Sequence, residues 1–260
     1  MRTVGISGSG NIACGLAVAL APSFEVRVLA RSAASAERSR GTLARMAKAP
    51  LPSVTVSNDP ASLAGADVLV EAVAEDLGVK IETLRALAAL GPTVPLVTTT
   101  SSLPLAELAA GCGAPERVAA VHVFSPVYVV PLVELAYPDE ATAATREAVA
   151  NLCATIGKTV IEVPPVPGFV VNRVVFPMLI AAVETLTLTG LPAASVDDAM
   201  QLALGHRLGP LRTLDFIGLD VAIAIAARLD LPVPPLLRDM VAAGRLGRKS
   251  GTGFFVYRSP

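Results

Sequence analysis

The chain has 260 residues, of which 21 are Lys or Arg and 22 are Asp or Glu, and its formal net charge is −1. So balanced a charge gives no electrostatic reason to expect nucleic acid or an anionic membrane as a partner. Hydrophobic residues make up 53% of the sequence. Every apolar run is interrupted before it reaches the roughly 20 residues that a membrane-spanning helix needs. The high apolar content therefore favours a buried oligomer face over a membrane-spanning helix.

The first residues and the cysteines favour a cytoplasmic protein. Met1 is followed directly by a strand-like segment rather than by a secretory signal. The three cysteines, Cys14, Cys112 and Cys153, are odd in number and have no metal-like spacing. We therefore expect free thiols that pack in the interior, and no metal site.

The first 30 residues predict a strand, a tight turn, a helix and a second strand. Residues 4–6 lead into a glycine-containing turn, the apolar run from Leu16 to Leu20 indicates a helix, and residues 26–29 indicate the second strand. The stretch from Ser32 to Lys48, rich in Ala, Arg and Ser, predicts one helix. Further short apolar strands follow, mostly separated by helical segments, at residues 54–56, 68–70, 96–98 and 118–121.

This alternation of strands and helices predicts a parallel, doubly wound sheet. From about Pro167 strand-like runs nearly vanish and apolar helices take over, after the proline-rich stretch 164–168. We therefore expect an α/β domain over residues 1–166 and an all-helical domain over residues 167–260. The helix over residues 176–189 is apolar on most faces, which predicts burial in a core or against a second copy of the chain.

The turn after the first strand carries the pattern G-x-G-x-x-A, with Gly8, Gly10 and Ala13 in the three small positions. Gly8 would permit the tight turn, Gly10 would let a pyrophosphate approach the backbone, and Ala13 would let the helix pack on the strand. The free N–H groups at the start of the helix would then bind phosphate. This context favours a Rossmann-type dinucleotide site over an ordinary glycine turn. The predicted cofactor contacts in this turn are Gly8, Ser9, Gly10, Asn11 and Ile12.

The end of the second strand carries Ala30, Arg31 and Ser32, where an acid would accept hydrogen bonds from the ribose 2′-OH of NAD. A guanidinium could instead hold a 2′-phosphate by paired hydrogen bonds. We include all three residues in the predicted cofactor site and expect NADP(H) to be preferred, with NAD(H) possible. The alternative is a solvated surface arginine.

His122 follows the apolar run 118–121, and Glu134 lies 12 residues later in an apolar setting that would bury its carboxylate. A buried Glu beside a His would fix the imidazole tautomer and raise its basicity, which suits a general acid/base. Taken alone, His122 is better interpreted as a core histidine with a satisfied hydrogen bond.

Several motifs in one order resemble the short-chain L-3-hydroxyacyl-CoA dehydrogenases over nearly the whole chain. The order and spacing of Ser101, His122, Glu134 and Asn172 are also those of that family's serine, histidine, glutamate and asparagine. The segments that carry the resemblance are T-T-T-S-S-L at 98–103, H-V-F-S-P at 122–126, P-G-F-V-V-N-R at 167–173, L-G-P-L at 208–211 with D-F-I-G-L-D at 215–220, and G-R-K-S-G-T-G-F at 247–254.

The resemblance implies an oxidoreductase that interconverts 3-hydroxyacyl and 3-ketoacyl thioesters. It implies that His122 exchanges the proton of the hydroxyl group, that Glu134 orients His122, and that Ser101 and Asn172 hold the substrate. It also implies a helical domain that forms a homodimer. Other positions that it places near the cofactor are Glu75, Lys80 and Thr99. For Glu75 and Lys80 the alternative is an acid at a helix start and a solvated lysine.

The sequence departs from the family pattern at several places. Thr99 and Ser125 each replace an asparagine, and the acid after the second strand is missing. The segment 32–53 is shorter than the family's helical hairpin, which extends over the CoA portion of the substrate. We hypothesise that the acyl group can arrive on an acyl carrier protein, which needs no adenosine contacts.

Two other classes of protein remain as alternatives. One is a 3-hydroxyacid dehydrogenase with a catalytic lysine, but residues 174–177, one turn after Asn172, are Val-Val-Phe-Pro and contain no lysine. The other is a non-catalytic nucleotide-binding or lens-type structural protein. Such a protein has no need of Ser101, His122, Glu134 and Asn172 together.

Overall fold

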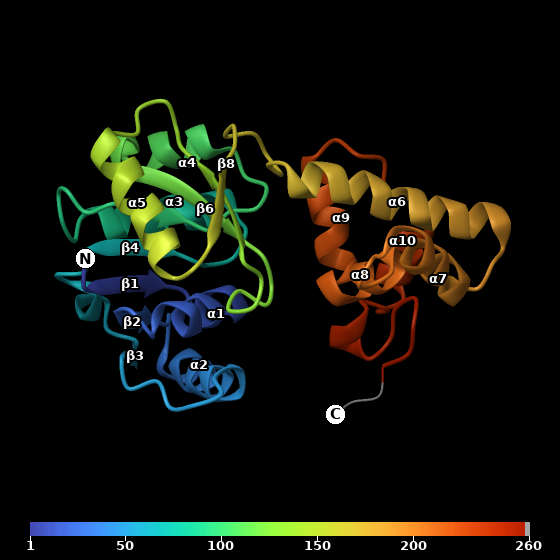
Figure 1. Cartoon of the computed structure of the whole chain (residues 1–260), viewed down its shortest axis with the longest axis horizontal. Helices are drawn as coiled ribbons and strands as arrows, with labels where there is room; N and C mark the ends of the chain where they lie inside the picture. The colour runs from blue at the N-terminus through green and yellow to red at the C-terminus, as the bar shows by residue number, and fades with distance from the viewer. Residues whose placement is uncertain (258–260) are drawn as a thin grey trace. The chain divides into compact units, whose positions relative to one another are not determined.

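The computed structural model describes residues 1–257, which fall into two compact units, residues 1–169 and residues 170–257 (Figure 1). The division follows shortly after the proline-rich stretch, where the sequence predicted a boundary between residues 166 and 167. The first unit is an α/β sandwich and the second is helical, as predicted.

The first unit is built on one eight-stranded sheet in the order β3-β2-β1-β4-β5-β6-β7-β8. All neighbouring strands are parallel except β6 and β7, which are antiparallel. The sequence did not predict β7 or β8 as strands. The strands are β1 (Thr3–Ser7), β2 (Glu25–Leu29), β3 (Val54–Ser57), β4 (Val68–Glu71), β5 (Leu96–Thr98), β6 (Val118–Val123), β7 (Leu132–Ala136) and β8 (Thr159–Glu162).

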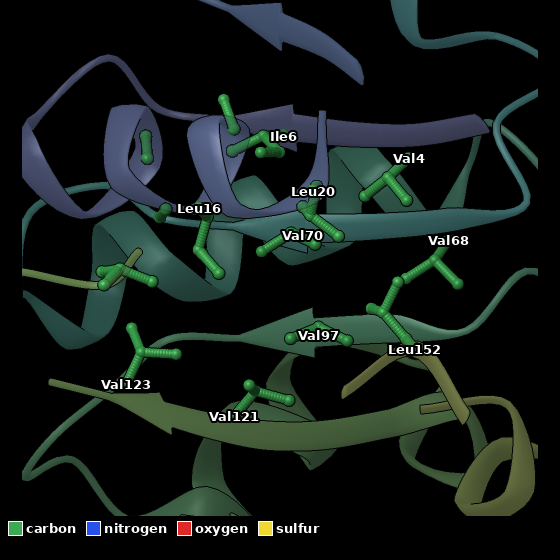
Figure 2. Packing of buried hydrophobic residues seen from close by; sticks show 14 of the residues in the cluster. Val4, Ile6, Leu16, Leu20, Val68, Val70, Val97, Val121, Val123 and Leu152 are labelled. Atoms are coloured by element: carbon green, nitrogen blue, oxygen red, sulfur yellow. The ribbon is translucent and has the colours of Figure 1, made fainter. Parts of the chain in front are cut away.

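Two apolar clusters lie against this sheet. One joins α1, α2 and α5 to the strands, and the other joins α3 and α4 to them. Figure 2 shows the first cluster, in which Leu16 and Leu20 of α1 lie among strand residues such as Ile6 and Val70. The helices of this unit are α1 (Asn11–Leu20), α2 (Ala33–Met46), α3 (Leu77–Ala88), α4 (Leu105–Cys112) and α5 (Ala143–Thr155).

A single helix connects β2 to β3, as the sequence predicted. Ser32 caps α2, because its side chain accepts a hydrogen bond from the backbone N–H of Ser35 at 3.2 Å. The helix ends at Met46, and β3 begins at Val54. The chain has no helical hairpin in this segment.

The second unit consists of helices around one apolar core. Phe176, Leu179 and Val183 of α6 pack with Leu211 and Leu214 in this core. The side chain of Leu188, on the same helix, is 87% exposed, so α6 is buried on one face only. The helices are α6 (Val171–Thr189), α7 (Ala193–Leu204), α8 (Pro210–Ile217), α9 (Leu219–Arg228) and α10 (Pro235–Ala242).

By length and composition, α6 is the one helix among residues 1–257 that could cross a membrane. The sequence analysis had found no sufficiently long uninterrupted apolar run. A core helix of a globular protein passes the same test of length and mean hydropathy. Because one face of α6 packs in the helical core, we interpret it as a core helix.

Candidate functional site

A cavity of the first unit lies where β1, β2 and β4 end. It has a volume of about 650 Å³. Parallel strands bring their carboxyl ends to one edge of the sheet, and doubly wound folds bind their ligands at that edge. Seven of the predicted cofactor residues line this cavity: Gly8, Ser9, Gly10, Asn11, Ile12, Ala30 and Arg31.

The glycine-rich turn fits a dinucleotide. Gly8 has a φ of +141°, and a Cβ there would collide with the carbonyl group of Ala72. A Cβ on Gly10 would meet no heavy atom within 4 Å, so the backbone there faces open space. Gly10 also precedes α1 without a side-chain cap, which leaves the first N–H groups of the helix to bind phosphate.

The wall of this cavity beside the end of β2 contains cations but no acid. Arg31 and Arg38 line it, and no Asp or Glu from residues 1–257 does. Ala30 is buried and offers only its backbone. Ser32 caps α2 beside this wall. The charge of this wall therefore suits a phosphate better than a free ribose diol.

His122 and Glu134 face each other across the antiparallel pair β6–β7. They are register partners, and His122 Nδ1 lies 2.7 Å from Glu134 Oε2. Both side chains are buried. The carboxylate accepts a hydrogen bond from Nδ1–H, so Nε2 is the nitrogen left to exchange a proton with a substrate. The structure thus forms the pair that the sequence proposed.

Aromatic rings surround the imidazole. The ring centroid of Phe124 lies 4.5 Å from that of His122, and the centroid of Phe169 lies at 5.3 Å. These apolar rings limit the access of water to the dyad, which strengthens the interaction between the carboxylate and the imidazole. The sequence analysis did not identify either phenylalanine as part of the site.

Ser101 follows β5 and is held by Glu75. Glu75 Oε1 accepts hydrogen bonds from Ser101 N at 2.8 Å and from Ser101 Oγ at 3.2 Å. It also accepts from Thr100 Oγ1 at 2.8 Å and from Ser102 N at 3.0 Å. One carboxylate oxygen thus organises three consecutive residues, so Glu75 positions the loop that carries Ser101.

Lys80 is 1% exposed, so its interpretation as a solvated lysine is wrong. Its Nζ lies 2.7 Å from Glu71 Oε1 and 3.4 Å from Glu75 Oε2. It does not line the cavity described above. Its ammonium therefore neutralises buried carboxylates within the protein.

The sequence analysis missed Glu71. This fully buried residue ends β4, and its Oε2 accepts a hydrogen bond from Thr98 Oγ1 at 2.6 Å. The available signal was an acid directly after the apolar run 68–70. An acid there must be paired, because an unpaired buried carboxylate is very costly.

The pKa of Glu75 has two opposed causes. Burial alone would raise it, whereas the charge of Lys80 and the hydrogen bonds from Ser101, Thr100 and Ser102 lower it. The lowering causes prevail, and the pKa lies below the usual range of a glutamate. Glu75 is therefore ionised at neutral pH and accepts all of these hydrogen bonds.

Two further predicted residues lie in different parts of the chain. Thr99 follows β5, and its N–H donates to Glu71 O at 3.1 Å. Asn172 lies in the first turn of α6, in the helical unit, and remains a predicted site residue on the sequence pattern. Within the described residues, no group of three or more His, Cys, Asp or Glu side chains could hold a metal ion.

Nearly all of the described chain matches one protein family. Residues 3–166 match the NAD binding domain of 3-hydroxyacyl-CoA dehydrogenase, and residues 168–257 match the C-terminal domain of the same family. The two matched segments meet near the division between the two units.

Relatives with full-length similarity carry related names. A probable 3-hydroxybutyryl-CoA dehydrogenase of Bacillus subtilis is 34% identical, over 99% of this chain and 98% of the relative. The crystal structure of FadB2 from M. tuberculosis has a TM-score of 0.94 at 32% identity, with 99% of each chain covered. The (S)-3-hydroxybutyryl-CoA dehydrogenase of Ralstonia eutropha has a TM-score of 0.90 at 32% identity, with 100% of each chain covered.

Proposed function

This chain belongs to the 3-hydroxyacyl-CoA dehydrogenase family of oxidoreductases, and on that premise we propose that it interconverts 3-hydroxyacyl and 3-ketoacyl thioesters, with NADP(H) preferred over NAD(H). The observation that carries the proposal is the buried contact of 2.7 Å between His122 Nδ1 and Glu134 Oε2. The relatives named after 3-hydroxybutyryl-CoA support a short acyl chain and the S alcohol.

In this mechanism His122 exchanges the proton and Glu134 stabilises the charge. During oxidation, Nε2 takes the proton of the 3-hydroxyl group, and the resulting imidazolium is stabilised by the carboxylate that accepts from Nδ1–H. During reduction, the imidazolium returns a proton to the new alkoxide oxygen. The bound nicotinamide supplies the hydride acceptor or donor. Ser101, in a loop that Glu75 positions, would contact the substrate oxygen, and the family pattern implies the same role for Asn172.

The cofactor turn and its arginines support the choice of cofactor. Gly8, Gly10 and the start of α1 would hold the pyrophosphate, and the wall with Arg31 would hold the 2′-phosphate. Thr99, directly after β5, would lie near the nicotinamide, as the family pattern implies.

The first test measures oxidation of NADPH and of NADH with acetoacetyl-CoA as the substrate, in the wild type and in His122→Ala. We expect turnover with NADPH and a loss of about 10²- to 10⁴-fold in the variant, because general acid catalysis is removed. His206→Ala is the matched control, since His206 is the second of the two histidines. Turnover with NADH alone would support the proposed dehydrogenase activity and reject the preference for NADP(H). Full activity of His122→Ala would reject the mechanism.

An acyl carrier protein is a second candidate carrier, and the single helix between β2 and β3 favours it. Without a helical hairpin, this segment offers little surface for the nucleotide of CoA. We expect acetoacetyl-pantetheine to react with a kcat/KM similar to that of acetoacetyl-CoA, and a carrier-bound substrate to react better than either. A strong preference for the CoA thioester, with no gain from a carrier protein, would reject this candidate.

We further propose that the enzyme is a cytoplasmic homodimer that associates through its helical unit. The side chains of Leu188 on α6 and Leu202 on α7 are 87% and 88% exposed, which is costly for leucines that face water. Sedimentation of the wild type should give twice the mass of the chain, and Leu188→Asp with Leu202→Asp should shift it towards the monomer. A wild-type monomer would contradict the proposal.

A further inference from the structure

The first turns of α2 form one wall of the proposed cofactor cavity. This wall contains Arg38, to which no role has been assigned so far. Arg38 lies on α2 and lines the cavity together with Arg31 and Ser35. Arg31 follows β2 directly, so the two guanidinium groups come from two different elements. Both residues line the cavity, and Arg31 lies beyond the carboxyl end of β2, where Rossmann-type folds bind the adenosine ribose.

Hydrogen bonds hold Arg38 in this wall. Its Nη2 donates to Ser35 Oγ at 2.8 Å, and Ser35 is 3% exposed. Ser35 Oγ also accepts from Ser32 Oγ at 3.1 Å. The Ser35 hydroxyl thus accepts two hydrogen bonds. The side chain of Arg38 is therefore positioned by a small hydrogen-bonded network at the helix start.

The two arginines are not used in ion pairs. Within residues 1–257, neither Arg31 nor Arg38 lies within 4.0 Å of a carboxylate, whereas Arg40, half a turn further along α2, pairs with Glu37 at 2.9 Å. Arg40 also donates to Val56 O and does not line this cavity. The cationic charge of the wall is thus available for an anion, and no acid in the wall competes for it.

We propose that Arg38, held by Ser35 and Ser32, acts with Arg31 as a specificity-determining residue that binds the 2′-phosphate of the adenosine half of NADP(H). This inference rests on the cofactor preference proposed above and extends it to a second, preorganised arginine. Two guanidinium groups match the charge of a phosphate dianion and offer it paired N–H donors. Ala30 supplies no carboxylate that could accept hydrogen bonds from a free 2′-hydroxyl group.

The test is calorimetric binding of adenosine 2′,5′-bisphosphate and of 5′-AMP, which needs no turnover. The wild type should bind the bisphosphate more tightly than 5′-AMP. Arg38→Met should weaken binding of the bisphosphate by about 10- to 100-fold, the usual range for loss of a hydrogen bond to a charged group, and should leave binding of 5′-AMP unchanged. Ser35→Ala should give a smaller loss of the same selectivity.

Arg40→Met is the matched control, since it removes a paired arginine from the same helix outside the cavity, and its affinities should equal those of the wild type. Thermal unfolding of each variant checks that the fold is retained. If Arg31→Met weakens binding of the bisphosphate but Arg38→Met does not, the inference about Arg38 is overturned and the cofactor preference stands. If the wild type binds 5′-AMP as tightly as the bisphosphate, the cofactor preference itself is rejected.

Discussion

Two buried clusters of ionisable side chains lie at the same edge of the sheet and are built in different ways. Glu71, Lys80 and Glu75 form a compact group whose members lie within ten residues of one another in the sequence. His122 and Glu134 come from two strands and meet because β6 and β7 are antiparallel. The first cluster depends on local chain geometry and the second on a long-range strand register.

The chemistry of the two clusters differs as well. Lys80 forms ion pairs with two carboxylates, and these carboxylates accept hydrogen bonds from Thr98 and from the loop of Ser101. The second cluster contains an imidazole, a group that serves as a general acid and base in enzymes. The comparison teaches that one cluster holds the site in place, whereas the other can take up and release a proton.

The largest effect on activity that we expect within this comparison follows from Glu134→Gln. The amide has nearly the shape of the carboxylate, but it lacks the charge and can stabilise the wrong tautomer of His122. We expect kcat to fall by about 10²- to 10⁴-fold while the thermal midpoint changes little. Steady-state kinetics and thermal unfolding of the same preparation check this. An unchanged kcat would mean that Glu134 is only a structural partner.

Lys80→Met should show the opposite pattern, with its main effect on stability. It leaves Glu71 as an uncompensated buried charge, which typically costs about 3–5 kcal/mol of unfolding free energy. Urea denaturation measures the loss. Replacing both partners, in Glu71→Gln with Lys80→Met, should recover much of it. The exposed Lys48→Met is the control and should stay within about 0.5 kcal/mol of the wild type.

The smallest effect concerns the pH dependence that Glu75 confers. Because its pKa is lowered in the folded protein, its contribution to stability is complete above the pKa of an unfolded glutamate, near 4.3, and is lost as the pH falls through the folded value. The stability difference between the wild type and Glu75→Gln should therefore shrink below about pH 4. We expect a smaller loss than for Lys80→Met, since the Glu75 side chain remains 27% exposed.

Glu82→Gln is the control for this pH series, because Glu82 is an exposed residue of the same helix α3. The difference in unfolding free energy between Glu82→Gln and the wild type should not change between pH 7 and pH 3. A stability difference for Glu75→Gln that does not change with pH would show that the hydrogen bonds to the Ser101 loop do not depend on an ionised carboxylate.

Local patterns determined much of the fold. The strand, glycine turn and helix at residues 3–20 follow from apolar periodicity and from the small residues that a tight turn requires. The single helix after β2 and the change to helices near residue 167 could also be read from the sequence. β7 and β8 were not predicted. The β8 segment is largely exposed and lacks a clear alternation of apolar and polar residues.

The candidate site, like the fold, has parts that the sequence predicted and parts that only the tertiary structure formed. The sequence by itself identified His122, Glu134 and the glycine-rich turn, since residue type and spacing are local properties. Only the tertiary structure placed His122 opposite Glu134, buried Lys80 beside Glu71, and turned Arg38 towards the cofactor cavity. These arrangements depend on strand register, helix packing and the need of buried charges for partners, and those interactions join residues that the sequence keeps apart.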